Sequence, residues 1–273
     1  MFESMNYRAQ LEAWFGHLSL EVDDLFLLER FQLLALRERA PRLALGAVLV
    51  AVPRLHRFIA TRCPELAGWL NGLLDSGSNT AGELAEHERT LVWELADLLV
   101  YQRFPEAYDE LAELRWDATQ LGDICELEGT TIIDAGAGTG WLSEQLAHSA
   151  QTVYAVEPVS RLRETIRGRA ANAGLENLFA VDGFLHRVPL PPSSADVLVT
   201  SRAIGWQLES ELAEVERVLR PDGWAIHCIG TPANGARTEL DETLESWGYA
   251  PSQYRDGGGA RRRYAKQIEK RSD

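Results

Sequence analysis

The stretch from Thr130 to Trp141 reads TTIIDAGAGTGW. It opens with a run of β-branched residues that ends at Asp134, which is typical of a buried strand. Three glycines follow at alternate positions from 136 to 140, and a helical pattern begins at Trp141. Glycine lets the backbone turn tightly and approach a ligand, and the free N–H groups of a helix start attract anionic or electron-rich groups. The stretch therefore predicts a strand, a cofactor-binding turn and a helix.

Two acidic residues follow the glycines at the ends of further strand-like segments. The segment Thr152–Val156 ends at Glu157, and Leu178–Val181 ends at Asp182-Gly183. An acidic residue about 20 positions beyond a glycine loop is placed to bind ribose hydroxyls. The glycine spacing is G-x-G-x-G and not the dinucleotide pattern G-x-G-x-x-G. This spacing counts against an NAD enzyme, which is the other nucleotide-fold interpretation.

Two later segments complete the pattern. Residues 189–202 read PLPPSSADVLVTSR and lead into a strand, and residues 214–230 read EVERVLRPDGWAIHCIG. The second contains a helix end, an Arg-Pro-Asp-Gly turn and another strand, and Pro-Asp-Gly is a sound turn signal. In this order, the motifs resemble those of the class I methyltransferases that use S-adenosylmethionine. The resemblance covers roughly residues 122–270.

The resemblance implies both a fold and a set of cofactor-binding residues. The fold is α/β, with a Rossmann-like, seven-stranded, mostly parallel sheet and an antiparallel last strand. The cofactor is S-adenosylmethionine, the product is S-adenosylhomocysteine, and Asp182 meets the adenine amino group. The residues expected to bind the cofactor are Asp134, Gly136, Ala137, Gly138, Gly140, Glu157, Pro158, Asp182, Gly183 and Ser201.

Hydrophobic periodicity divides the chain into two domains. Residues 1–121 show apolar residues at helical spacing and predict an all-helical N-terminal domain. Within it we expect one helix through Leu91 to about Arg103 and another from Pro105 to about Leu121. From residue 122 to 273 strands alternate with helices, as in a parallel sheet with right-handed crossovers. We expect strands near 130–135, 152–157, 178–182, 195–201 and 223–230, helices near 140–149, 159–173, 208–219 and 236–247, and a closing hairpin.

Charge and composition limit the classes of partner. The 273-residue chain has a net charge of −14, with −8 over residues 1–121 and −6 over residues 122–273. Neither part is basic, so nucleic acid is not a favoured partner. The basic cluster Arg261–Arg263 is expected to lie on a solvated terminal strand. The most apolar run, Leu43–Val52, is too short to span a bilayer and predicts a buried helix.

Cysteine usage and the N-terminus favour the cytoplasm. Cys63, Cys125 and Cys228 lie far apart without a C-x-x-C pair, so neither a metal site nor a disulfide framework is expected. No basic segment followed by an apolar stretch opens the chain, so a signal peptide is not expected either.

The acceptor side is less sharply defined. Methyl transfer from a sulfonium is a direct displacement that needs an aligned nucleophile and exclusion of water. His186 is a candidate base, although a loop histidine without a role is the alternative. Arg202 is a candidate partner for an acceptor carboxylate or phosphate, or a surface ion pair. Tyr101, Tyr108 and Trp206 are candidates for the acceptor side or a lid.

The sequence therefore predicts a cytoplasmic methyltransferase with a small-molecule acceptor, whose helical domain selects that acceptor. Residues 200–206 depart from the Asn/Asp-Pro-Pro-Tyr motif of enzymes that methylate adenine, cytosine or glutamine amides. Two alternatives stay open: a methyltransferase acting on a protein or tRNA, and a non-catalytic cofactor-binding regulator or scaffold.

Overall fold

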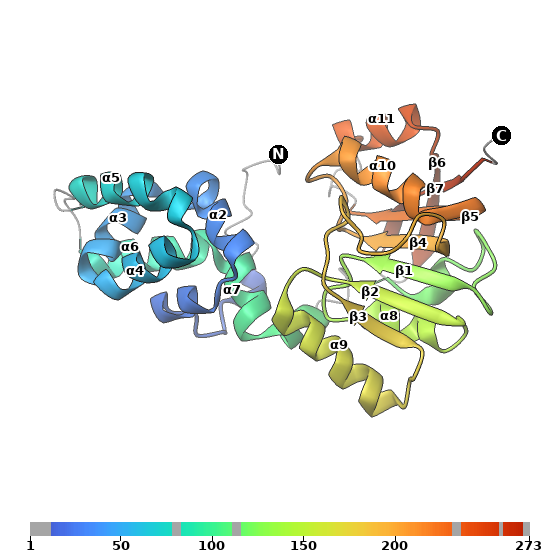
Figure 1. The fold of residues 1–273 in the computed structure, drawn as a ribbon, viewed down its shortest axis with the longest axis horizontal. Coiled ribbons are helices and arrows are strands. Elements are labelled where there is room, and N and C mark those ends of the chain that lie inside the picture. The colour runs from blue at the N-terminus through green and yellow to red at the C-terminus, as the bar shows by residue number, and fades with distance from the viewer. Residues whose placement is uncertain (1–11, 78–82, 111–115, 231–235, 257–258, 270–273) are drawn as a thin grey trace. The chain divides into compact units, whose positions relative to one another are not determined.

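A computed structural model describes residues 12–77, 83–110, 116–230, 236–256 and 259–269 (Figure 1). The chain forms two compact units, Met1–Ala107 and Tyr108–Asp273. The first is helical and the second contains the sheet; we call them the helical unit and the sheet unit. Trp116 and Leu121 are buried in the sheet core, so the compact sheet unit begins earlier in the chain than residue 122. The expected division of labour between the two parts stays a prediction.

The helical unit buries one apolar core formed by short helices. Prolines stand at the starts of several of them, where a missing N–H costs nothing: Pro53 and Pro64 occupy first-turn positions, and Pro41 is an N-cap. The elements are η1 (Val22–Leu27), α2 (Arg30–Arg39), α3 (Arg42–Ala51), α4 (Pro53–Arg62), η2 (Pro64–Leu66), α5 (Ala67–Gly77), α6 (Leu84–Glu94) and α7 (Ala96–Arg103).

The apolar run near Leu43–Val52 forms α3, whose residues 44–49 are buried, as expected. The helix expected through Leu91 to Arg103 is wrong as one continuous element. It breaks at Leu95, whose φ of −113° and ψ of 10° are not helical. The sequence carries no proline or glycine there, and Leu95 is fully buried in the core, so tertiary packing sets this bend.

Among the described residues, no single helix is long and apolar enough to cross a bilayer. Taken together, α3 and α4 are long and apolar enough to do so, but the chain bends by 112° between them, at Val52. Helices that are mostly buried in a protein core can have the same length and apolar composition.

The sheet unit has seven strands in the order β3-β2-β1-β4-β5-β7-β6. All neighbours pair in parallel except β5 with β7 and β7 with β6, which pair antiparallel. The strands are β1 (Thr131–Ala135), β2 (Thr152–Val156), β3 (Leu178–Val181), β4 (Ala195–Ser201), β5 (Leu219–Ile229), β6 (Ala250–Asp256) and β7 (Gly259–Gln267). The predicted fold class is confirmed.

Helices cover both faces of this sheet (Figure 1). They are α8 (Trp141–Ala147), α9 (Ser160–Ala173), α10 (Leu208–Val218) and α11 (Glu239–Ser246). Side chains alternate along β1: Ile132 packs in the core with α8 and α9, and Ile133 packs in the core with α10 and α11. This alternation follows from the two-residue period of a strand, and burial on both faces explains the apolar runs of the sequence.

The segment before β1 differs from the expected helix over Pro105 to Leu121. Its described parts are two 3-10 turns, η3 (Pro105–Glu110) and η5 (Ala118–Gln120). Asp117 is extended and accepts a hydrogen bond from the Thr119 N–H, which starts η5 as a new turn.

The expected solvated strand at Arg261–Arg263 is also wrong for two of its three arginines. Arg262 is buried and pairs with the fully buried Asp241, and Arg263 is buried and pairs with Asp123. These guanidinium groups hold β7 to α11 and to the segment before β1. They do not form a basic surface.

Candidate functional site

The candidate site lies where the strand order reverses, between β1 and β4. From β1 the chain continues outward to β2 and β3 on one side, and β4 and β5 fill the other side. Ligands of open α/β sheets bind beyond the carboxyl ends of the strands at this switch point. The ends of β1, β2, β3 and β4 carry the residues that the sequence singled out, and parallel pairing brings these ends to one edge.

The three glycines of the glycine loop, residues 136–140, share a backbone conformation but differ in their surroundings. Gly136, Gly138 and Gly140 all have positive φ, at 72°, 57° and 80°. A Cβ at Gly136 would lie 2.2 Å from Ala203 Cβ, and one at Gly140 would lie 2.8 Å from Ile166 Cγ1. A Cβ at Gly138 would meet no heavy atom within 4 Å. Gly136 and Gly140 are therefore packed against protein, whereas Gly138 faces open space.

Glu157 connects the end of β2 to the glycine loop. Its Oε2 accepts a hydrogen bond from the Gly138 N–H at 2.9 Å, and its Oε1 accepts one from the Val159 N–H at 2.9 Å. The carboxyl group is buried, and burial raises its pKa to about 7, although both hydrogen bonds act in the opposite direction. A buried acid thus binds the glycine of this loop that faces open space.

Asp134 is a second buried acid, at the end of β1. Its Oδ2 accepts a 2.5 Å hydrogen bond from the Ser143 hydroxyl of α8. Its Oδ1 is buried and has no hydrogen-bond partner among the described residues. Burial raises the pKa of Asp134 to about 6. An unpaired buried carboxylate oxygen is costly, so a ligand N–H or O–H group that donates to Asp134 Oδ1 would be bound favourably.

Arg163 of α9 connects the ends of β2 and β3. Its Nη1 donates to the carbonyl oxygens of Glu157 and Pro158 at 2.8 and 2.7 Å, and to Asp182 Oδ1 at 3.1 Å. The Asp182 side chain is 72% exposed and available to a ligand. Gly183 must be small, because a Cβ there would lie 2.6 Å from Pro189 Cδ.

Residues 202–207 after β4, called the β4 loop, contact the glycine loop through Ala203 and Gly136. Ser201 ends β4 opposite Cys228 of β5. Arg202 is exposed, has a positive φ of 62°, and donates its N–H to the Cys228 carbonyl at 2.8 Å. A positive φ is uncommon for a residue other than glycine.

Glu211 fixes the tip of the β4 loop. It is only 2% exposed, and its carboxylate accepts hydrogen bonds from the N–H groups of Gly205, Trp206 and Gln207 at 2.7, 3.2 and 3.0 Å. The Trp206 side chain is 73% exposed. A large aromatic ring thus projects to solvent from a backbone that a buried carboxylate holds in place.

The remaining candidates, His186, Tyr101 and Tyr108, lie in three different segments. His186 stacks on Phe184 in the loop after β3, with ring centroids 5.2 Å apart. His227 is buried in β5 beside Thr200, and burial lowers its pKa to about 3, so it is a neutral core residue. Tyr101 lies in α7 of the helical unit, and Tyr108 lies in η3 at the start of the sheet unit.

Sequence reasoning missed several residues that shape the site. Asp109 of η3 accepts a hydrogen bond from the hydroxyl of Thr139 in the glycine loop, although 30 residues separate them. Ser143, Arg163 and Glu211 lie on the first turns of their helices. An acidic residue in the first turn of α10 was a usable signal for Glu211; the contacts of Asp109 depend on the fold and left no sequence signal.

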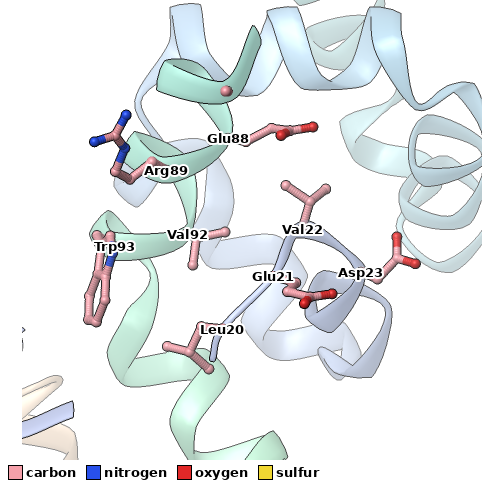
Figure 2. A pocket seen from close by; sticks show the side chains of 9 residues that line it. Leu20, Glu21, Val22, Asp23, Glu88, Arg89, Val92 and Trp93 are labelled. Atoms are coloured by element: carbon pink, nitrogen blue, oxygen red, sulfur yellow. The ribbon is translucent and has the colours of Figure 1, made fainter. Parts of the chain in front are cut away.

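A groove of about 400 Å³ lies in the helical unit, between η1 and α6 (Figure 2). Val22 and Val92 contribute apolar surface, and Glu21, Asp23 and Glu88 contribute carboxylates. Its lining contains none of the residues that the sequence singled out. Across the parts of the chain that the structure describes, no cluster of three or more His, Cys, Asp or Glu side chains could hold a metal ion.

Comparison with known proteins agrees with this geometry. A family model described as a methyltransferase domain matches residues 133–227. The malonyl-[acyl-carrier protein] O-methyltransferase of Serratia marcescens is 30% identical over 149 residues, covering 53% of this chain and 56% of the relative. An uncharacterized methyltransferase of Geobacillus sp. (strain WCH70) is 30% identical over 118 residues, covering 42% and 53%. The chain thus spans about half the length of these curated relatives.

Two solved structures share the fold. A SAM-dependent methyltransferase from Aquifex aeolicus matches with a TM-score of 0.50 and 19% identity, over 60% of this chain and 98% of its own. The 1,6-didemethyltoxoflavin-N1-methyltransferase of Burkholderia thailandensis, solved with bound 1,6-didemethyltoxoflavin and S-adenosylhomocysteine, matches with a TM-score of 0.51 and 18% identity, over 70% of this chain and 93% of its own. Residues 133–227 of this chain thus resemble a methyltransferase domain, and the sheet unit shares its fold with S-adenosylmethionine-dependent methyltransferases.

Proposed function

We propose that this protein transfers the methyl group of S-adenosylmethionine to a small-molecule acceptor. One observation carries the proposal: Gly138 faces open space while its N–H is held by the buried carboxylate of Glu157. This arrangement offers a ligand close approach to the backbone beside a buried acid. The G-x-G-x-G spacing and the family match identify the ligand as S-adenosylmethionine and not NAD.

The residues present fit that cofactor. Glu157 would accept hydrogen bonds from the ribose hydroxyls, and the exposed Asp182 carboxylate would meet the adenine amino group. The unpaired Asp134 Oδ1 is an acceptor for a donor at the end of β1. The remaining contacts would come from Gly136, Ala137, Gly140, Pro158, Gly183 and Ser201. When bound, the cofactor supplies a methyl group that is already activated for displacement.

The protein must then position the acceptor and exclude water. The β4 loop is the element for this role, because it follows β4 at the switch point and contacts the glycine loop. Arg202 would pair with an acceptor carboxylate or phosphate, and Trp206 would provide a flat apolar surface. Tyr101, Tyr108 and the helical unit would contribute to acceptor selection, and His186 is a candidate base.

A second candidate acceptor is an acidic group carried by a protein. The Serratia marcescens relative is named for methylating malonyl-[acyl-carrier protein], and Arg202 suits a carboxylate. Because that relative has low identity to this chain and is only partly covered by it, we favour a small-molecule acceptor over a protein-bound one. The acidic charge of the chain, −14 overall, also disfavours an acidic protein or tRNA as docking partner.

Incubation of the full chain with methyl-labelled S-adenosylmethionine tests the proposal. The probes are a panel of small carboxylic acids, phenols and amines, and separately a malonyl-loaded acyl carrier protein; a Glu157→Ala variant is the control. We expect label on a member of the small-molecule panel, and much less with the control at the same subsaturating cofactor concentration. Label on the carrier protein alone would favour the second candidate. Binding of S-adenosylhomocysteine without transfer to any probe would favour a non-catalytic regulator.

A further inference from the structure

Asp109, near the start of the sheet unit, contacts the glycine loop through its side chain. Its Oδ1 accepts a 2.5 Å hydrogen bond from the Thr139 hydroxyl, and its Oδ2 accepts one from the Arg169 guanidinium. The Asp109 side chain is largely buried. Thr139 and Arg169 lie 30 and 60 residues away along the chain, so this contact is a product of the fold and not of a local turn.

Thr139 occupies a sensitive position in the loop. It lies between Gly138 and Gly140, both with positive φ, and its side chain is buried. Gly140 is the N-cap residue of α8, and its N–H donates to the Ala137 carbonyl at 2.9 Å. Glycines permit many backbone conformations, so hydrogen bonds from outside the loop constrain it, as Glu157 does at the Gly138 N–H. The hydrogen bond from the Thr139 hydroxyl to Asp109 is such a constraint.

Arg169 extends the constraint to the helices that follow β1 and β2. It lies on α9, donates to Glu144 Oε2 of α8 at 3.1 Å, and places its guanidinium 5.8 Å from the centre of the Trp141 ring. Asp109 therefore contacts the glycine loop directly, and contacts α8 and α9 through one arginine. Charge-assisted hydrogen bonds are roughly twice as strong as neutral ones, and water competes weakly at a largely buried pair.

We propose that Asp109 is a positioning residue for cofactor binding: through the Thr139 hydroxyl it keeps the glycine loop in the conformation that receives S-adenosylmethionine. The proposal rests on the proposed function, since it assigns a role toward the same cofactor. Asp109 lies in η3, so the conformation of that turn is thereby linked to cofactor binding.

Calorimetric titration of the full chain with S-adenosylhomocysteine tests the proposal, together with the unfolding temperature of each variant. Thr139→Val keeps the size of the side chain and removes the hydroxyl, and we expect about a tenfold loss of affinity, equivalent to 1.4 kcal/mol. Thr139→Ser keeps the hydroxyl and should bind within about twofold of the original chain. Asp109→Ala should lose about as much as Thr139→Val.

The double variant Asp109→Ala with Thr139→Val is the decisive comparison. If the two residues act through one hydrogen bond, the double variant should bind about as well as Thr139→Val alone. Glu144→Gln is the matched control, because it disturbs the other partner of Arg169 and leaves the Asp109–Thr139 bond. Its affinity should not change.

Three results would overturn the proposal. The first is a lower unfolding temperature for Thr139→Val with unchanged affinity, which would make Asp109 a structural anchor only. The second is a double variant whose affinity loss is the product of the single losses, which would mean independent effects. The third is loss of affinity in Thr139→Ser as large as in Thr139→Val. A folded original chain that does not bind S-adenosylhomocysteine would instead overturn the proposed function, and this proposal with it.

Discussion

Gly138→Ala separates ligand contact from backbone strain, because the chain contains a matched control. Gly138 has a φ of 57°, and an added Cβ would meet no heavy atom within 4 Å. Gly129 has a φ of 68°, and a Cβ there would also meet nothing within 4 Å. Gly129 precedes β1 and therefore lies at the opposite end of that strand from the glycine loop. Both substitutions impose the same kind of strain, and only one is at the proposed cofactor site.

The expected magnitudes follow from this geometry. A left-handed conformation costs a non-glycine residue about 1–2 kcal/mol. In a protein of this size, each kcal/mol lowers the unfolding temperature by about 2–4 °C. Both variants should therefore fold, with similarly lowered unfolding temperatures. Only Gly138→Ala should lose at least about tenfold in S-adenosylhomocysteine affinity, since its methyl group occupies the space that the ligand must enter.

Calorimetric titration of the two variants and the original chain gives the answer. Gly136→Ala is a poor test, because its Cβ would overlap Ala203 and disturb the fold itself. Unchanged affinity in a folded Gly138→Ala variant would refute the reasoning. Equal affinity losses in Gly138→Ala and Gly129→Ala would refute it too, since the effect would then arise from strain and not from contact.

Three further predictions concern the buried acids. Glu157→Ala should lower cofactor affinity by about 2–3 kcal/mol, because charge-assisted hydrogen bonds are lost; a calorimetric loss below about threefold would contradict this. Burial raises the pKa of Glu157 to about 7 from an ordinary 4.5, so between these values the folded chain holds a proton that the unfolded chain has released. The free energy of unfolding of the cofactor-free chain should therefore fall as pH rises from about 5 to 7, by on the order of 3 kcal/mol. Urea unfolding should show a weaker slope in Glu157→Gln, and an equal slope would assign the effect to other groups. Glu211→Ala should destabilise the chain by about 1–3 kcal/mol, because buried N–H groups of the β4 loop lose their acceptor; unchanged urea unfolding would show that water replaces the carboxylate.

The alternation of strands and helices was predictable from the sequence because both faces of the sheet are covered. The strand Thr131–Ala135 begins with a β-branched run, the loop after it carries three glycines, and the next helix starts at Trp141. Each of these signals is local. The order of the strands was not predicted from these local signals, whereas the family resemblance supplied the antiparallel end of the sheet.

The features that escaped prediction are those set by tertiary contacts. The helix breaks at Leu95 although no glycine or proline lies there. Leu95 is fully buried, so packing in the core determines the position of the break. Arg262 and Arg263 look like a solvated basic run, yet they are buried because Asp241 and Asp123 supply partner charges from distant segments. Asp109 escaped for the same reason. Within the site, strand-end acids were predictable, whereas the groups that hold them were not.

The most direct test of the central claim is calorimetric titration of the full chain with S-adenosylhomocysteine, repeated in the presence of NADH. We predict one molecule bound per chain, with an affinity that NADH does not change. A folded chain that binds no S-adenosylhomocysteine, or one from which NADH displaces it, would contradict the assignment of the glycine loop to S-adenosylmethionine.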